Sequence, residues 1–138
     1  MSFLRRILIN YNFINPPSIS NFKQVRIVKD DTWNNIPESE ILVEFYNIDK
    51  KIGHIQYRLG TGQIGLIYLD EEYRGYGLGK QILTDTINEM KKNNIKDIWA
   101  VTSKSHDFWS NVFDKSFKWY DSKDLHPSVS GDGYKMKL

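Results

Sequence analysis

The stretch Leu69-Asp70-Glu71-Glu72-Tyr73-Arg74-Gly75-Tyr76-Gly77-Leu78-Gly79-Lys80 decides the fold, because it joins an apolar segment to an amphipathic one through three closely spaced glycines. Glycine lacks a Cβ, so the backbone at Gly75, Gly77 and Gly79 can turn sharply and approach a ligand closely. The helix expected to begin near Gly77 leaves its first N–H groups without intrahelical partners, and its dipole adds partial positive charge there. The stretch therefore predicts a pyrophosphate-binding loop, flanked by the cationic side chains of Arg74 and Lys80.

The residues on either side of this loop predict a strand before it and a helix after it. Residues 63–69 form a short apolar run, which is typical of a buried strand. From Leu78 to Met90 apolar side chains recur at helical spacing, and residues 91–94 supply a basic last turn and a stop. A Walker loop requires Gly-Lys followed by Ser or Thr, and a dinucleotide-binding loop requires Gly-x-Gly-x-x-Gly. Neither spacing is present, so both classes of phosphate loop are excluded.

The order of strand, acidic turn, glycine loop and helix resembles that of a known family. Arg74-x-x-Gly77-x-Gly79, entered through Glu71-Glu72-Tyr73, is similar to the acetyl-CoA motif of the GNAT superfamily of N-acetyltransferases. The resemblance covers roughly residues 40 to 138. It implies an α/β (α+β) fold with a mixed, mostly antiparallel central sheet, a strand-loop-helix acetyl-CoA motif and flanking helices. The family usually places two helices between its first and second strands, and the N-terminal region here is short for them.

The other segments follow the order that this resemblance implies. Residues 41–46 and 52–59 predict two strands joined by a turn, and residues 95–102 predict a strand that a right-handed crossover places parallel to residues 63–69. We expect a second amphipathic helix over 105–117 and closing strands at 117–120 and 134–138. Before residue 40 we expect a first strand from Phe22 to Val28, and at most a short helix over 31–37. Residues 1–138 are expected to form one domain.

Composition limits the classes of function. The formal charge is +2, with 19 basic residues spread among 17 acidic ones and no basic cluster, so we expect no nucleic-acid partner. Cysteine is absent, which removes disulfides and thiolate nucleophiles and fits a reducing compartment. Asn10 interrupts the apolar run after Arg5-Arg6, so neither a signal peptide nor a membrane partner is expected. The three histidines show no ligand spacing, so no metal is expected. We expect a cytoplasmic protein that is a monomer or a homodimer.

The resemblance also implies which residues bind acetyl-CoA, the expected cosubstrate. Backbone N–H groups of the loop would hold the pyrophosphate, and the backbone around Leu69 would pair with the pantetheine arm like an added strand. Ser105 is placed either to bind the cofactor or to cap the second helix, and Trp109 either to form a cofactor wall or to pack in the core. The full implied set is Tyr68, Leu69, Arg74, Gly75, Tyr76, Gly77, Leu78, Gly79, Lys80, Ser105 and Trp109.

The proton carriers of the family are replaced in this sequence. Many members carry a Glu four residues before the equivalent of Leu69, where this chain has Gly65. Many also carry a Tyr in the second helix, where Trp109 stands, and an indole N–H cannot act as a proton donor to sulfur. The candidates that remain for a general base are Glu44 and His54, or a water chain. For a general acid they are Tyr120 and Tyr134, although all four side chains have simpler structural roles open to them.

The sequence therefore predicts an acetyl-CoA-dependent N-acetyltransferase. It would transfer the acetyl group directly to a primary amine of a small molecule or of a protein or peptide, without a covalent enzyme intermediate. The missing Glu and Tyr motivate one alternative, a catalytically degenerate GNAT-fold module that binds CoA.

Overall fold

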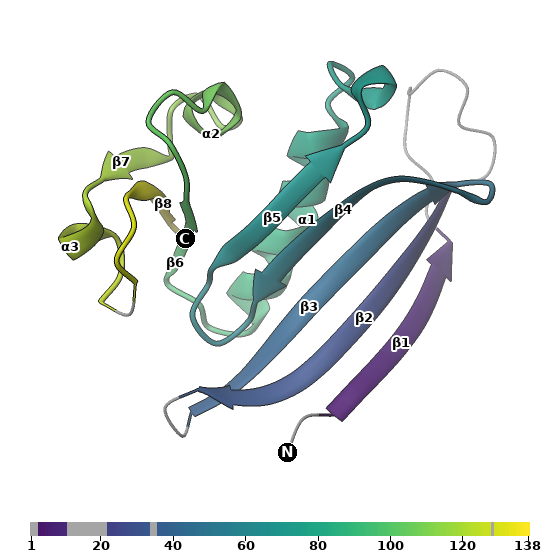
Figure 1. Ribbon diagram of the computed structural model, residues 1–138, viewed down its shortest axis with the longest axis horizontal. Helices are drawn as coiled ribbons and strands as arrows, with labels where there is room; N and C mark the ends of the chain where they lie inside the picture. The colour runs from purple at the N-terminus through teal and green to yellow at the C-terminus, as the bar shows by residue number, and fades with distance from the viewer. Residues whose placement is uncertain (1–2, 11–21, 34–35, 128) are drawn as a thin grey trace.

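A computed structural model of the chain describes residues 3–10, 22–33, 36–127 and 129–138. The described strands form a five-stranded sheet in the order β1-β2-β3-β4-β5 and a three-stranded sheet in the order β6-β8-β7 (Figure 1). The element bounds are β1 Phe3–Asn10, β2 Phe22–Trp33, β3 Ile36–Asn47, β4 Lys50–Arg58, β5 Ile64–Leu69, the 3-10 turn η1 Glu71–Tyr73, α1 Leu78–Lys92, β6 Asp97–Val101, α2 Asp107–Asn111, β7 Lys118–Tyr120, α3 Ser122–Leu125 and β8 Gly133–Lys137. This mixed α+β architecture, with antiparallel sheets and flanking helices, is the predicted fold class.

The meander β3-β4-β5 packs one face against α1, and this packing forms the core. Antiparallel pairing sets Val43 opposite Ile55 and Ile55 opposite Ile67, so side chains two residues apart along each strand share the inner face. The apolar stripe of α1 that the sequence predicts is buried against them, from Leu78 through Leu83 to Met90. Full burial of one such side chain stabilises the fold by about 1.5–3 kcal/mol. The predicted strands and the predicted long helix are confirmed.

A cluster of charged and polar groups also ties α1 to the sheet. Arg26 on β2 forms an ion pair with Glu89 on α1, with one Nη1–Oε2 distance of 2.8 Å, and Tyr57 on β4 donates its hydroxyl proton to the same carboxylate at 2.7 Å. Burial desolvates the Glu89 carboxylate, but the hydrogen bonds from Arg26 and Tyr57 outweigh that effect and lower its pKa. The hydrogen bond to Glu89 raises the pKa of Arg26, so both partners stay charged. The cluster therefore holds α1 in one position on the sheet.

Among the described strands, the two sheets are joined through a single bridge. Gln63 forms this isolated parallel bridge to Trp99, and the Trp99 indole N–H donates to the Thr61 carbonyl oxygen at 2.9 Å. Beyond this point β5 pairs with β4 along one edge, while its other edge has no ladder partner among the described strands. In Figure 1 the sheets come together at the lower end of β5 and separate toward its upper end. The predicted parallel neighbour of β5 is thus present, but it leaves β5 after that bridge.

Several boundaries differ from the sequence-based expectations. Residues 31–37 were expected to hold at most a short helix, but β2 continues to Trp33 and β3 begins at Ile36. The strand expected to be first is second, because Phe3–Asn10 forms β1 and pairs with it. The helix expected over 105–117 extends only over Asp107–Asn111, since the chain turns at Asp114 and Lys115, whose φ angles are 49° and 65°. No described helix is long and apolar enough to cross a membrane.

Candidate functional site

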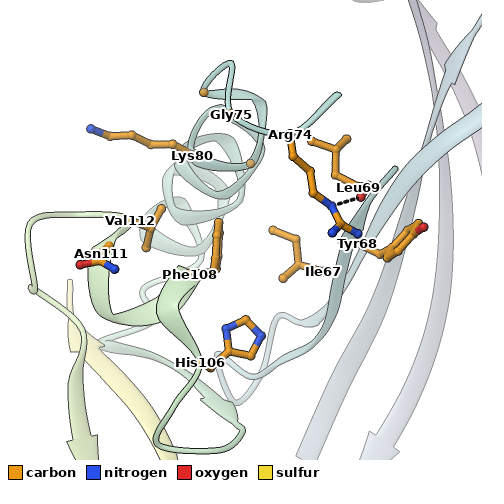
Figure 2. Close-up of a pocket in the computed structure, with 12 residues that line it drawn as sticks. Ile67, Tyr68, Leu69, Arg74, Gly75, Lys80, His106, Phe108, Asn111 and Val112 are labelled. Atoms are coloured by element: carbon orange, nitrogen blue, oxygen red, sulfur yellow. Dashed lines mark hydrogen bonds between the residues drawn. The ribbon is translucent and has the colours of Figure 1, made fainter. Parts of the chain in front are cut away.

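A pocket of about 610 Å³ opens where β5, the glycine loop and α2 meet (Figure 2). Its walls come from the end of β5, the start of α1 and the segment around α2, so it lies in the space left by the separation of the two sheets. Its lining residues are Ile67, Tyr68, Leu69, Arg74, Gly75, Gly77, Gly79, Lys80, His106, Phe108, Asn111 and Val112. The volume lies within the range of roughly 300–1,000 Å³ that is usual for small-molecule sites.

The glycine loop presents backbone donors at one end of this pocket. Gly75 and Gly77 have φ angles of 84° and 83°, a left-handed conformation that other residues adopt only with strain. Gly77 precedes the first residue of α1, and no side chain caps that end of the helix. A Cβ added at Gly75 or Gly77 would meet no atom beyond its chain neighbours within 4 Å, whereas a Cβ on Gly79 would lie 3.1 Å from Phe108 Cε1. The first N–H groups of α1 are therefore accessible to an anion.

Two cationic side chains flank this end of the pocket. The Arg74 Nε donates to the Leu69 carbonyl oxygen at 2.7 Å, and the Arg74 guanidinium lies 5.5 Å from the centroid of the Tyr68 ring. Lys80 Nζ lies 5.7 Å from the centroid of the Phe113 ring. Beneath the loop Tyr73 is buried, and its hydroxyl accepts a hydrogen bond from the Asn47 side chain at 3.0 Å. The cations and the backbone donors together give this end of the pocket groups that favour an anion.

These residues fit an extended ligand with a phosphate group at one end. The loop supplies donors for the phosphate, and the unpaired edge of β5 leaves backbone groups that an amide-bearing chain can satisfy. The close approach of Gly79 to Phe108 shows that a methyl group at position 79 would take space from this end of the pocket. Acetyl-CoA has the features that this site requires.

The base candidates lie on the opposite face of the five-stranded sheet. Glu44 and His54 are directly paired across β3 and β4, and the His54 ring stacks on Tyr68 with 5.7 Å between centroids. Glu44 forms a 3.1 Å ion pair with Lys51. Partial burial, with a smaller contribution from Lys51, lowers the pKa of His54, so its imidazole is neutral at pH 7. Its Nδ1 atom is buried and has no hydrogen-bond partner in the described part of the chain.

The acid candidates lie outside the pocket lining. The Tyr134 side chain is buried and its hydroxyl donates to the Lys104 carbonyl oxygen at 2.8 Å. Tyr120 lies on β7, where Lys135 Nζ lies 4.3 Å from the centroid of its ring. Each of these tyrosines has a structural partner at some distance from the loop.

The predicted cofactor residues divide into two groups. Seven of them line the pocket, namely Tyr68, Leu69, Arg74, Gly75, Gly77, Gly79 and Lys80. Tyr76 is half exposed and Leu78 is buried in the core, although its backbone belongs to the loop. Ser105 is exposed and lies 3.1 Å from the Ser103 hydroxyl, while Trp109 packs edge-on against Phe108 and Phe117. These four are outside the lining set.

Sequence reasoning missed the part of the lining that α2 provides. His106 immediately precedes α2, and Phe108, Asn111 and Val112 follow at i, i+3 and i+4. This spacing puts the last three on one helical face, which could have identified them as a wall. Ile67 was missed because a strand residue next to a ligand cannot be told from a core residue by its type. Among the described residues no group of three His, Asp or Glu side chains could hold a metal ion.

Comparisons with known proteins agree with this geometry. Residues 8–113 match the family model described as the Acetyltransferase (GNAT) family. No curated protein gave a significant match. The fold is similar to that of PaiA N-acetyltransferase from Thermoplasma acidophilum in complex with coenzyme A, with a TM-score of 0.55 and 20% identity over 70% of this chain and 60% of that one.

Two further solved structures are similar at comparable levels. A GNAT family acetyltransferase from Staphylococcus aureus has a TM-score of 0.55 and 23% identity over 73% of this chain and 68% of that one. One from Elizabethkingia anophelis with acetyl-CoA bound has a TM-score of 0.53 and 21% identity over 72% of this chain and 76% of that one. At these identities the structures establish a shared fold.

Proposed function

The chain belongs to the Acetyltransferase (GNAT) family, and from this premise we propose that it transfers the acetyl group of acetyl-CoA directly to a primary amine. The observation that carries the proposal is the pocket in which an electropositive glycine loop continues into the unpaired edge of β5. Structures of the same fold with coenzyme A and with acetyl-CoA support it. We infer one catalytic domain over residues 1–138, acting in the cytoplasm as a monomer or a homodimer.

Binding would use backbone groups more than side chains. The first N–H groups of α1 and the cations Arg74 and Lys80 would hold the pyrophosphate. The edge of β5 that has no ladder partner would orient the amide-bearing arm toward Ile67, beyond the Leu69 carbonyl oxygen that accepts from Arg74 Nε. Acetyl-CoA, when bound, supplies the activated acyl group, so the protein has to position the two substrates and move protons.

The amine would approach from the face of β5 opposite α1, because the pocket face is occupied by the cofactor. Leu66 and Tyr68 project there with 58% and 46% of their surfaces exposed, and His54 lies beside Tyr68. A neutral His54 can take the proton of the incoming ammonium, directly or through one water molecule. Glu44, paired with His54 across the strands, is the second candidate for this role. The exposure of this face admits an amine carried on a peptide as well as a small one.

The first experiment measures binding of acetyl-CoA by its effect on thermal unfolding. A ligand present at a hundred times its Kd stabilises the folded state by about 2.7 kcal/mol, which raises Tm by several degrees in a chain of this size. Acetyl-pantetheine, which lacks the pyrophosphate, is the matched control and should give a smaller shift. If millimolar acetyl-CoA leaves Tm unchanged, the pocket is not a CoA site and the proposal is wrong.

The second experiment separates transfer from binding alone. Release of free thiol from acetyl-CoA is followed over a panel of primary amines that includes small amines, peptides with free N-termini and peptides with lysine. Amine-dependent release supports the transferase. The degenerate module remains a specific alternative because Gly65 and a buried Trp109 stand where the family often has its Glu and Tyr. Binding without turnover on any amine would establish that alternative.

A further inference from the structure

We propose that His106 is the proton donor to the sulfur of the departing coenzyme A thiolate, an assignment that rests on the proposed acetyl transfer. Direct transfer leaves a thiolate that needs a proton, and neither tyrosine considered from the sequence lines the pocket. His106 does line it, although nothing in the sequence pattern singled it out.

His106 lies at the end of the pocket opposite the glycine loop. Figure 2 shows the glycine loop at one end, His106 at the other, and Phe108 and Ile67 between them. A ligand that places its pyrophosphate on the loop and extends along β5 toward Ile67 therefore directs its far end toward His106. In acetyl-CoA that far end carries the thioester.

The His106 ring is held by aromatic neighbours. The described residues give its ring two aromatic neighbours, Phe108 and Trp109, each with 6.4 Å between centroids, and no hydrogen bond. Its nitrogens are thus available to a ligand, while the aromatic contacts restrict the ring. The residue is exposed to solvent, so its imidazole can recover a proton after each turnover.

The other ionisable residues of the lining are less suited to this role. A guanidinium such as that of Arg74 is not a general acid in proteins, and Lys80 lies with the glycine loop at the other end of the pocket. Tyr68 projects to the opposite face of β5, where it stacks on His54. The charged groups that accompany His106 are Arg74 and Lys80 in the pocket and Asp107 next to it in the chain. Imidazole changes charge between pH 5 and 8, which suits transfer to a thiolate near neutral pH.

The step is balanced in atoms and electrons. A bond forms between the amine nitrogen and the acyl carbon, the carbon–sulfur bond breaks, and its electron pair leaves on sulfur. The imidazolium of His106 gives its N–H proton to that sulfur, so a neutral thiol and a neutral imidazole result. The proton lost by the amine leaves on the other face of β5, toward His54. The two histidines would thus act on opposite sides of one strand, His54 beside Tyr68 and His106 beyond Ile67.

The decisive test compares two leaving groups in the wild type and in His106→Gln. The variant should bind acetyl-CoA with a Kd within about threefold of wild type, and transfer from acetyl-CoA should slow by about a hundredfold, because general acids contribute roughly 10²–10⁴ to a rate. The acetyl ester of seleno-coenzyme A has a far more acidic leaving group, so its transfer should slow by less than about tenfold. His126→Gln is the matched control, since His126 stacks on Trp99 away from the pocket. Equal slowing with both esters, or no slowing, would overturn the assignment.

A second readout needs no turnover and separates this inference from the proposed function. The titration of the His106 imidazole is followed by NMR in the free protein, with coenzyme A and with desulfo-coenzyme A. Contact with the sulfur predicts a higher titration midpoint with coenzyme A than with the desulfo form, and no difference for His126. Equal midpoints for His106 would refute the contact even if transfer occurs. A sulfur-dependent shift without transfer to any amine would keep the contact and reject the proposed activity.

Discussion

Replacement of Gly79 by alanine should separate cofactor binding from fold stability. Gly79 lies in the first turn of α1, and its φ is not in the left-handed region, so alanine fits the backbone there. The new Cβ would lie 3.1 Å from Phe108 Cε1, a contact that the half-buried ring can relieve by moving a few tenths of an ångström. Because alanine is preferred over glycine in helices by up to about 1 kcal/mol, the free energy of unfolding should change by no more than that amount in either direction.

The same methyl group should nevertheless weaken acetyl-CoA binding. It would enter the part of the pocket where we propose that the first N–H groups of α1 bind the phosphate, and a loss of one charge-assisted hydrogen bond costs about 1.5–3 kcal/mol. Each 1.4 kcal/mol is tenfold in Kd, so we expect Kd to rise by roughly 10- to 100-fold. Titration calorimetry with acetyl-CoA gives Kd, and urea unfolding without ligand gives the stability.

Two further variants separate an effect on acetyl-CoA affinity from an effect on stability. Gly77→Ala forces alanine to a φ of 83° and should cost about 1–2 kcal/mol of stability as well as affinity. Gly65→Ala is the matched control, because its Cβ would lie 3.5 Å from the nearest atom, an ordinary contact outside the pocket. It should alter neither quantity. If Gly79→Ala binds acetyl-CoA as tightly as the wild type, the phosphate does not lie against the start of α1 and the site has been assigned wrongly.

Other regions of the fold give further predictions. Glu89→Gln should cost about 1–3 kcal/mol at pH 7, since it removes the negative charge that pairs with the half-buried guanidinium of Arg26. Because the pKa of Glu89 is lowered from 4.5 in the folded state, its carboxylate stabilises the fold above pH 4.5, and this stabilisation is lost as the pH falls below that value. The free energy of unfolding, measured from pH 7 to 3, should therefore depend less on pH in the variant than in the wild type. Glu38→Ala should cost about 1–3 kcal/mol in thermal unfolding, because the Gly60 N–H loses its 2.7 Å acceptor. Tyr134→Phe should lower the free energy of unfolding by about 1 kcal/mol and change the transfer rate less than twofold. A large loss of rate would show that Tyr134 takes part in catalysis. The decline of the transfer rate at low pH should have its midpoint below pH 6.5, because burial lowers the pKa of His54. In His54→Gln a water molecule would have to act as the base, and this decline should be absent.

The sequence predicted those parts of the fold whose patterns are local and strong. The glycines at 75 and 77 suit a backbone with positive φ, and the apolar stripe from Leu78 to Met90 requires a helix that packs on a sheet. These local features were sufficient to locate the glycine loop that lines one end of the pocket. The strands from Ile41 to Leu69 followed from alternation and from the turn residues between them.

The features that the sequence did not predict depend on residues distant in the chain. Residues 31–33 have no strong strand pattern, and they are extended because β3 pairs with them. Asp114 and Lys115 adopt positive φ angles that their residue types do not indicate, so the end of α2 could not be predicted from the sequence. His106 enters the site only through the separation of the two sheets, which is a property of the tertiary structure.

Because Gln63 and Trp99 form the one bridge between the two sheets among the described strands, the proposed binding of acetyl-CoA would also affect how long the folded protein persists. A ligand lying along the open edge of β5 would contact both sheets, and its free energy of binding would add to the stability of the folded state. Stability would then follow the concentration of acetyl-CoA, rising when the metabolite is abundant and falling when it is scarce. The gap in the sheet would thus make turnover of the protein itself responsive to the supply of its substrate, with no separate regulatory site.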